Sequence, residues 1–208
     1  MSKIRRLYLI KTPSIIQRLF PNFLWRFLTQ EKVLYLTFDD GPIPEVTPWI
    51  LETLKQFEAK ATFFCVGDNV RKYPEISEQL IAEGHSVGNH TFHHLDGWKS
   101  KKDTYLEDVA RCANVLNSKL FRPPYGHLKS NQVRALRKEY QIVLWDILSG
   151  DFDLNLSKEK CLQNVLNYAK KGSIIVFHDS LKAEEKLRFV LPRVLEHYWA
   201  LGFRFEQI

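Results

Sequence analysis

Cysteine is scarce in this chain of 208 residues, which contains only three. Cys65, Cys112 and Cys161 lie far apart in the sequence, and none of them forms a Cys-x-x-Cys pair. An odd number of widely spaced cysteines argues against a disulfide framework. We therefore expect reduced, buried thiols, which suit a reducing compartment.

A long uninterrupted apolar run is also missing. No segment approaches the length of a membrane-spanning helix. The apolar stretch 7–10 follows a basic N-terminus, but Lys11 and Pro13 cut it short, and a secretory signal needs a longer apolar core. The sequence therefore predicts no membrane span and a cytoplasmic location.

Nucleic-acid-binding motifs, internal repeats and low-complexity tracts are absent as well. The net charge of +6 is carried by lysines and arginines that are scattered rather than clustered. We interpret this charge as a contribution to solubility and expect no nucleic-acid partner. With 45% apolar and 26% charged residues, the composition is typical of a soluble protein of one domain, and it leaves the oligomeric state open.

We expect residues 1–31 to form an N-terminal extension that packs on a domain formed by residues 32–208. Thr12 suits a helix N-cap, with Pro13 at the first helical position and Pro21 as the stop. The alternative is a contact with a membrane or a partner. Its residues would be Phe23, Leu24, Trp25 and Phe27. Because the apolar face is short and interrupted by proline, packing on the domain is favoured.

From Val33 onward, short β-rich runs alternate with helical patterns. The predicted strands are 33–38, 61–66, 86–89, 120–122, 142–145, 173–177 and 203–205. Helices are predicted to begin at Thr47 and Asp103, to span 74–83, to run from a Ser157 cap to Gly172, and to precede Gly202. This repeated alternation implies an α/β fold with a parallel sheet covered by helices, and seven strands suit a barrel better than a small open sheet.

Polar residues follow directly after most of these predicted strands. They are Asp39, Asp40, His90, Arg122, Asp146 and His178. In an α/β barrel such positions gather at one rim, which is the face where active sites are built. We therefore expect these segments to converge on one site.

Two histidines and an aspartate form the most informative pattern of the sequence. His90 and His94 stand four residues apart, so one turn of helix-like backbone would carry both imidazoles to the same side. Asp40 would complete a set that suits a divalent metal with an open coordination position, while Asp39 is left to act as a base. The alternative without a metal site is that the two histidines lie in a surface loop and that the aspartate begins a turn. The combined pattern predicts metal-assisted hydrolysis.

Five motifs in this order resemble those of the polysaccharide deacetylase family, the NodB-homology domain of carbohydrate esterase family four. The resemblance covers residues 32–208. The motifs are Thr-Phe-Asp-Asp-Gly-Pro at 37–42, His-Thr-Phe-His-His at 90–94, Arg-Pro-Pro-Tyr-Gly at 122–126, the segment 145–152, and Val-Phe-His at 176–178.

The resemblance implies a distorted (β/α) barrel of about seven parallel strands. It also implies an enzyme that removes acetyl groups from N-acetylated sugars, either oligosaccharides or polysaccharides. The expected cofactor is a divalent metal, Zn2+ before Co2+, Ni2+ or Mn2+, and the expected partner is the N-acetylated carbohydrate itself.

The family's metal ligands match Asp40, His90 and His94 in this sequence. By the same resemblance, Asp39 would be the catalytic base and His178 the acid that protonates the leaving amine.

Further roles follow from the later motifs. Arg122 would hold Asp39 ionised and correctly aimed, because a guanidinium makes two-point contacts with carboxylates. Tyr125 would stabilise the oxyanion through its backbone N–H, and its ring could stack on sugar. Trp145, Phe152 and Val176 would contact the substrate.

The fourth motif departs from the family pattern. Leu148 replaces an acid that orients the arginine of the third motif, and Phe152 replaces a tryptophan. We expect Asp146 or Asp151 to take over as the partner of Arg122. Val176 replaces a leucine of the acetyl pocket, so we expect activity with an altered substrate preference.

Two alternatives remain open. The same machinery suits an O-acetyl ester or another small amide, since the reacting centre is nearly identical. A catalytically silent sugar-binding barrel would predict loss of Asp39, Asp40 or His178, and all three are present.

Overall fold

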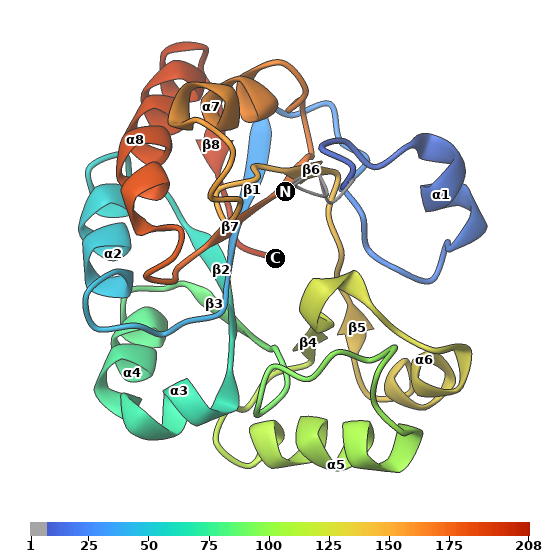
Figure 1. Cartoon of the computed structure of the whole chain (residues 1–208). Helices are drawn as coiled ribbons and strands as arrows, with labels where there is room; N and C mark the ends of the chain where they lie inside the picture. Colours follow the sequence, from blue (N-terminus) through green and yellow to red (C-terminus); the bar gives the residue numbers. More distant parts are fainter. Residues whose placement is uncertain (1–7) are drawn as a thin grey trace, which may run out of the picture.

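A curled sheet of parallel strands forms the centre of the structure, a computed structural model that describes residues 8–208 (Figure 1). The strands are β1 (Val33–Asp39), β2 (Ala61–Cys65), β3 (Ser86–Asn89), β4 (Leu120–Phe121), β5 (Gln141–Ile142), β6 (Ile147–Leu148), β7 (Ile174–His178) and β8 (Arg204–Phe205). Their order is β5–β4–β3–β2–β1–β7–β6, and β8 pairs with β1 beside this path. The predicted distorted (β/α) barrel is confirmed, with β6 as a strand that the sequence did not indicate.

Helices surround the strands (Figure 1). They are α1 (Ser14–Leu19), α2 (Thr47–Lys55), α3 (Gly67–Lys72), α4 (Pro74–Ala82), α5 (Lys102–Ala113), α6 (Ser130–Leu136), α7 (Lys158–Leu166) and α8 (Glu184–Ala200), with a short 3-10 turn, η1 (Pro124–Gly126). The predicted cap of α7 is confirmed, because Ser157 accepts a hydrogen bond from the Lys160 N–H. That helix ends at Leu166, however, and not at Gly172. Helices α3 and α6 were not predicted.

Successive side chains of β1 point to opposite faces of the sheet, as in any strand. Leu34, Leu36 and Phe38 point into the layer between the sheet and the helices, where they are fully buried. The Phe38 ring packs between Phe63 of β2 and Phe177 of β7, with ring centroids 4.9 and 5.8 Å apart. This stack joins three adjacent strands and fixes their relative height. The three cysteines are free and buried, as expected.

Strand register then decides which loops meet. Asp39 at the end of β1 pairs with Phe64 of β2 and with His178 of β7. Asn89 at the end of β3 pairs with Phe121 at the end of β4, so His90 and Arg122 follow at the same level. The carboxyl ends of four strands therefore meet at one rim.

Asp146 does not belong to that rim, which corrects the prediction. The predicted strand 142–145 is broken, and Asp146 lies at the amino end of β6 instead of the carboxyl end of a strand. Its N–H donates to the carbonyl of Ile174, the first residue of β7, and its carboxylate accepts from the Ser173 hydroxyl. Both contacts lie at the opposite end of the sheet.

The segment 8–31 runs along the strands at the β5 and β6 edges. Leu24 bridges to Val143, and Lys11 bridges to Ile147. Thr12 is not the predicted cap of α1, since Pro13 holds that position and the Thr12 hydroxyl donates to the Trp145 carbonyl at 2.8 Å. The proposed boundary at residue 31 stays a prediction. Residues 1–7 of the predicted extension lie outside the described residues.

None of the helices within residues 8–208 combines the length and the apolar character that crossing a membrane requires.

Gly88 of β3 allows the Phe64 ring to lie against the strand backbone. An added Cβ at this position would come within 2.4 Å of that ring. We expect Gly88→Ala to lower the free energy of unfolding by about 1–3 kcal/mol, as overpacking in a core does. Chemical denaturation measures this change, and Ser86→Ala on the same strand is the control. Equal stability of the two variants would contradict the packing described here.

Candidate metal centre

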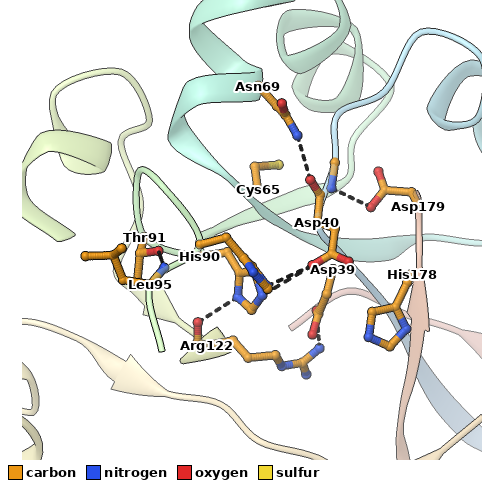
Figure 2. A network of polar contacts seen from close by, with 12 residues as sticks. Asp39, Asp40, Cys65, Asn69, His90, Thr91, Leu95, Arg122, His178 and Asp179 are labelled. Carbon is orange, nitrogen blue, oxygen red and sulfur yellow. Dashed lines mark hydrogen bonds and ion pairs between the residues drawn. The ribbon is translucent and has the colours of Figure 1, made fainter. Parts of the chain in front are cut away.

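Four segments that are far apart in the sequence meet at the rim of the sheet (Figure 2). They lie at the carboxyl ends of β1, β3, β4 and β7, and they carry Asp39 with Asp40, His90 with His94, Arg122, and His178. The structure thus brings together the predicted ligands, base, acid and arginine.

A tightly held turn aims the Asp40 carboxylate at the histidines. Asp40 has a φ of 87°, and its carbonyl accepts a hydrogen bond from the Asn69 side chain at 2.8 Å. The next N–H, that of Gly41, donates to Asp179 at 2.9 Å, and the Thr47 hydroxyl donates to the other oxygen of Asp179. A Cβ on Gly41 would lie 1.8 Å from that carboxylate, so the turn requires glycine.

Three potential ligand atoms face one another in this turn region. The Asp40 carboxylate lies 3.1 Å from His94 Nε2 and 3.7 Å from His90 Nε2. Ligand atoms of the three residues all lie within 4.8 Å of each other. Two imidazoles and one carboxylate are a donor set that suits a divalent ion with an open position. These residues therefore fit a divalent metal.

The environment of His90 keeps that side chain in the form a metal needs. Its Nδ1–H donates to the Arg122 carbonyl at 2.7 Å, so Nε2 carries the free lone pair. Burial lowers the pKa of His90 to about 4, which leaves the ring neutral at neutral pH. Burial alone would raise the pKa of Asp40, but the hydrogen bond and charges of the nearby histidines outweigh it and hold that pKa well below its usual value.

The loop that carries both histidines is not helical, which corrects the expectation of a helix-like turn. Thr91 and His94 have positive φ values of 61° and 56°. The two imidazoles still lie close, with ring centroids 5.1 Å apart. The loop gains its shape from hydrogen bonds rather than from helical repeat.

Asp108 of α5 is the main anchor of this loop. Its carboxylate accepts hydrogen bonds from the N–H groups of Phe92 and His93 at 2.8 and 2.9 Å. It also contacts the His93 ring, which therefore points away from the metal ligands. Sequence reasoning missed Asp108, because an acid on an amphipathic helix carries no signal of such a role.

Arg122 is fully buried and holds Asp39. Its guanidinium donates to the Asp39 carboxylate and to the Thr37 hydroxyl, both at 2.7 Å. It also donates to the carbonyls of Val143 and Leu144, and it lies 4.1 Å above the Phe64 ring. Each nitrogen of the guanidinium thus has an acceptor within the barrel, where an uncompensated charge would be costly.

The predicted partners of Arg122 are wrong. Asp146 bonds at the other end of the sheet, and Asp151 bonds to His178. Leu148 pairs in register with Val176, and Val176 pairs with Thr37, so all three point to the inner side of the sheet. The Thr37 hydroxyl and two backbone carbonyls share the guanidinium with Asp39. Thr37 was not singled out, because a threonine in a buried strand is unremarkable.

His178 is held by Asp151 from the segment after β6. The Asp151 carboxylate accepts from the His178 backbone N–H and contacts its Nδ1, each at 2.7 Å. Burial alone would lower the pKa of His178, but the charge and hydrogen bond of Asp151 outweigh it and raise the pKa to about 9. His178 is therefore protonated at neutral pH. In Figure 2, Asp39 lies between His178 and His90.

The other predicted substrate-binding residues lie at different depths around the site. Tyr125 is 58% exposed, and its ring lies 4.8 Å from that of His94. The Phe152 ring lies 5.0 Å from that of His178, and Trp145 is partly buried with its ring 5.9 Å from the Arg122 guanidinium. Val176 is fully buried in β7, two residues before His178. The roles of these four residues stay predictions.

Comparisons with known proteins agree with one another. A family model described as polysaccharide deacetylase matches residues 28–145. A peptidoglycan-N-acetylglucosamine deacetylase of Bacillus cereus is 33% identical over 87% of this chain and 88% of its own length. A chitooligosaccharide deacetylase of Azorhizobium caulinodans is 32% identical over 85% of this chain and 94% of its own.

A solved structure shares the fold over nearly the whole chain. It is a peptidoglycan N-acetylglucosamine deacetylase in complex with an N-oxidanyl-benzamide, with a TM-score of 0.87 and 30% sequence identity. The match covers 95% of each chain.

Metal retention tests the donor set. We expect His90→Ala to bind divalent metal at least about 100-fold more weakly, since even the loss of a supporting partner costs 10–100-fold at such sites. Elemental analysis after dialysis, together with zinc titration, measures this change. His197→Ala on α8 is the matched control and is expected to retain metal. If both variants keep the same amount of metal, the ion is bound elsewhere.

Proposed function

This chain belongs to the polysaccharide deacetylase family, and we propose that it removes acetyl groups from N-acetylated sugars by metal-assisted hydrolysis. One arrangement carries this proposal. The Asp40–His90–His94 set lies beside two charged pairs, Asp39 with Arg122 and His178 with Asp151. Amide hydrolysis needs a base, an acid and a polarised carbonyl, and this site offers residues for each.

Zn2+ is the proposed metal. Two imidazoles and one carboxylate match the donor atoms of open zinc sites, and Co2+, Ni2+ or Mn2+ are alternatives with the same donors. When bound, such an ion supplies Lewis-acid chemistry by making water more acidic and by polarising a carbonyl oxygen.

Asp39 is the proposed base. Its carboxylate is buried next to the ligand Asp40, and the Arg122 guanidinium fixes its direction through a contact of 2.7 Å. A carboxylate in this position takes a proton from the attacking water as the bond to the acetyl carbon forms. Arg122 acts through Asp39 and is a positioning residue.

His178 is the proposed acid. Asp151 contacts Nδ1, which leaves Nε2 as the ring atom that donates a proton to the departing sugar amine. The charge of Asp151 favours the protonated ring, so the proton is in place at neutral pH. The site thus places a carboxylate on one side of the proposed ligands and a histidine held by a carboxylate on the other, as a base and an acid require.

Oligomers or polymers that contain N-acetylglucosamine are the proposed substrates. Two relatives of similar length carry names that refer to peptidoglycan N-acetylglucosamine and to chitooligosaccharides. The Tyr125 ring at the rim lies exposed beside His94 and offers a surface for a sugar ring. The acetyl pocket is proposed to lie between Trp145, Phe152 and the ligands.

Turnover tests the base. We expect Asp39→Asn to retain zinc and to lose at least about 100-fold in kcat on N-acetylglucosamine oligomers, because general-base catalysis contributes 10²–10⁴-fold. Acetate release and metal content are measured on the same preparation. Asp103→Asn at an exposed helix position is the control. Full activity of Asp39→Asn would assign the base to another residue, and faster release from O-acetylated sugars would favour the esterase alternative.

The pH profile tests the acid. Because His178 must be protonated to donate and its pKa is raised to about 9, kcat is expected to fall as pH rises through that value. Asp151→Asn removes the charge that raises this pKa, so the fall is expected to move to lower pH. Rate profiles from pH 6 to about 10 measure the shift. An unchanged alkaline limb in Asp151→Asn would show that His178 does not supply the proton.

A further inference from the structure

A row of three aromatic rings leads outward from the metal ligand His94. The Tyr125 ring lies 4.8 Å from His94, and the His127 ring lies 5.9 Å from Tyr125. Trp98 then stacks on His127 with ring centroids 3.6 Å apart and an interplanar angle of only 7°. The row joins the loop after β3 to the loop after β4, the two loops that also carry His94 and Arg122.

Trp98 at the outer end is exposed but firmly held. The residue is 59% exposed, and its indole N–H donates to the Leu128 carbonyl at 3.2 Å. Its backbone N–H donates to Asp96 at 2.9 Å. The only polar atom of the indole is therefore satisfied by the protein, and the ring presents a flat apolar surface to solvent.

The two loops are locked to each other beneath this ring. Asp96 contacts Nδ1 of His127 at 3.1 Å. The Gln132 side chain donates to the Gly97 carbonyl at 3.0 Å and accepts from the Lys129 N–H at 2.8 Å. A Cβ on Gly97 would lie 2.2 Å from the His127 carbonyl, so the loops approach as closely as glycine allows. A surface fixed in this way loses little entropy when it binds a ligand.

A sugar ring is the ligand that this surface fits. The C–H groups on one face of a pyranose carry slight positive charge and pack on the negative face of an indole, which adds to the gain from apolar burial. The remaining hydroxyls point sideways into water or toward polar groups, and Asp96 lies beside the stack. Two rings are too small an area for a stable protein partner.

We propose that Trp98, stacked on His127, forms a second sugar-binding subsite, which holds a unit of the oligosaccharide next to the one that is deacetylated. This inference rests on the proposed function. Tyr125 connects the subsite to the reacting unit. The subsite makes the chain select oligomers over single sugars, because only an oligomer reaches both the metal ligands and Trp98.

The experiment compares N-acetylglucosamine oligomers from one to six units. We expect Trp98→Ala to raise KM above that of the unaltered chain, with little change in kcat. The increase is expected to be largest for the hexamer, at about five- to tenfold, and smallest for the shortest substrate. Trp98→Phe keeps a flat ring and is expected to restore most of the affinity. Trp98→Leu keeps apolar contact with His127 without a ring face and is expected to behave as the alanine variant does.

Trp199→Ala is the matched control. Trp199 is 62% exposed on α8 and packs on Phe57, away from the rim. Its kinetics are expected to equal those of the unaltered chain at every length. Thermal melting of all variants confirms that they fold. A loss in Trp98→Ala that is equal for all oligomer lengths, or no loss, overturns the subsite.

Direct binding separates the two proposals. Calorimetry with the N-acetylglucosamine hexamer is done on zinc-loaded Asp39→Asn, with and without Trp98→Ala. Weaker binding in the double variant supports the subsite, even if the unaltered chain releases no acetate from any sugar and the proposed function fails. Equal binding of the two variants overturns the subsite, even if the chain is an active deacetylase.

Discussion

A buried ion pair between Arg122 and Asp39 is the interaction on which the site depends. The guanidinium has no exposure to solvent and has its counter-charge 2.7 Å away at the end of β1. Removal of one member of such a pair leaves a buried charge without compensation and costs about 3–5 kcal/mol. The same residue also acts through its backbone, since the Arg122 carbonyl accepts from His90. One residue thus orients both the proposed base and a proposed metal ligand. Because Arg122 directly follows β4, the position of both side chains depends on the conformation of that strand.

Three further buried carboxylates hold the loops of the rim. Asp179 fixes the turn after Asp40, Asp108 fixes the loop between His90 and His94, and Asp151 fixes His178. Each of them accepts a backbone N–H and contacts a side chain as well. This repeated arrangement lets irregular loops keep defined positions without helical or sheet hydrogen bonds. It places functional side chains on loops whose geometry is nearly as fixed as that of the strands below them.

Much of this site could be predicted because its residues lie at the carboxyl ends of strands. Asp39 and His178 end β1 and β7, whose apolar runs are easy to recognise, and His90 follows the short strand β3. The prediction failed where the pattern is short. The segment 141–148 contains two strands of two residues each with a break between them, and no periodicity can be read from so few residues. Asp146 was therefore placed at the wrong end of the sheet, and neither Asp146 nor Asp151, the two predicted alternatives, is the partner of Arg122.

The sequence by itself determined the alternation of strands and helices, and with it the rim at which the proposed ligands and base meet. Local apolar pattern suffices for this, because parallel strands all present their carboxyl ends on the same side. Only the tertiary structure decided which carboxylate pairs with which basic side chain. It also decided that Trp98 stacks on His127 beyond the metal ligands. Such pairings join residues dozens of positions apart through loops, whose paths depend on backbone hydrogen bonds that no local sequence pattern encodes.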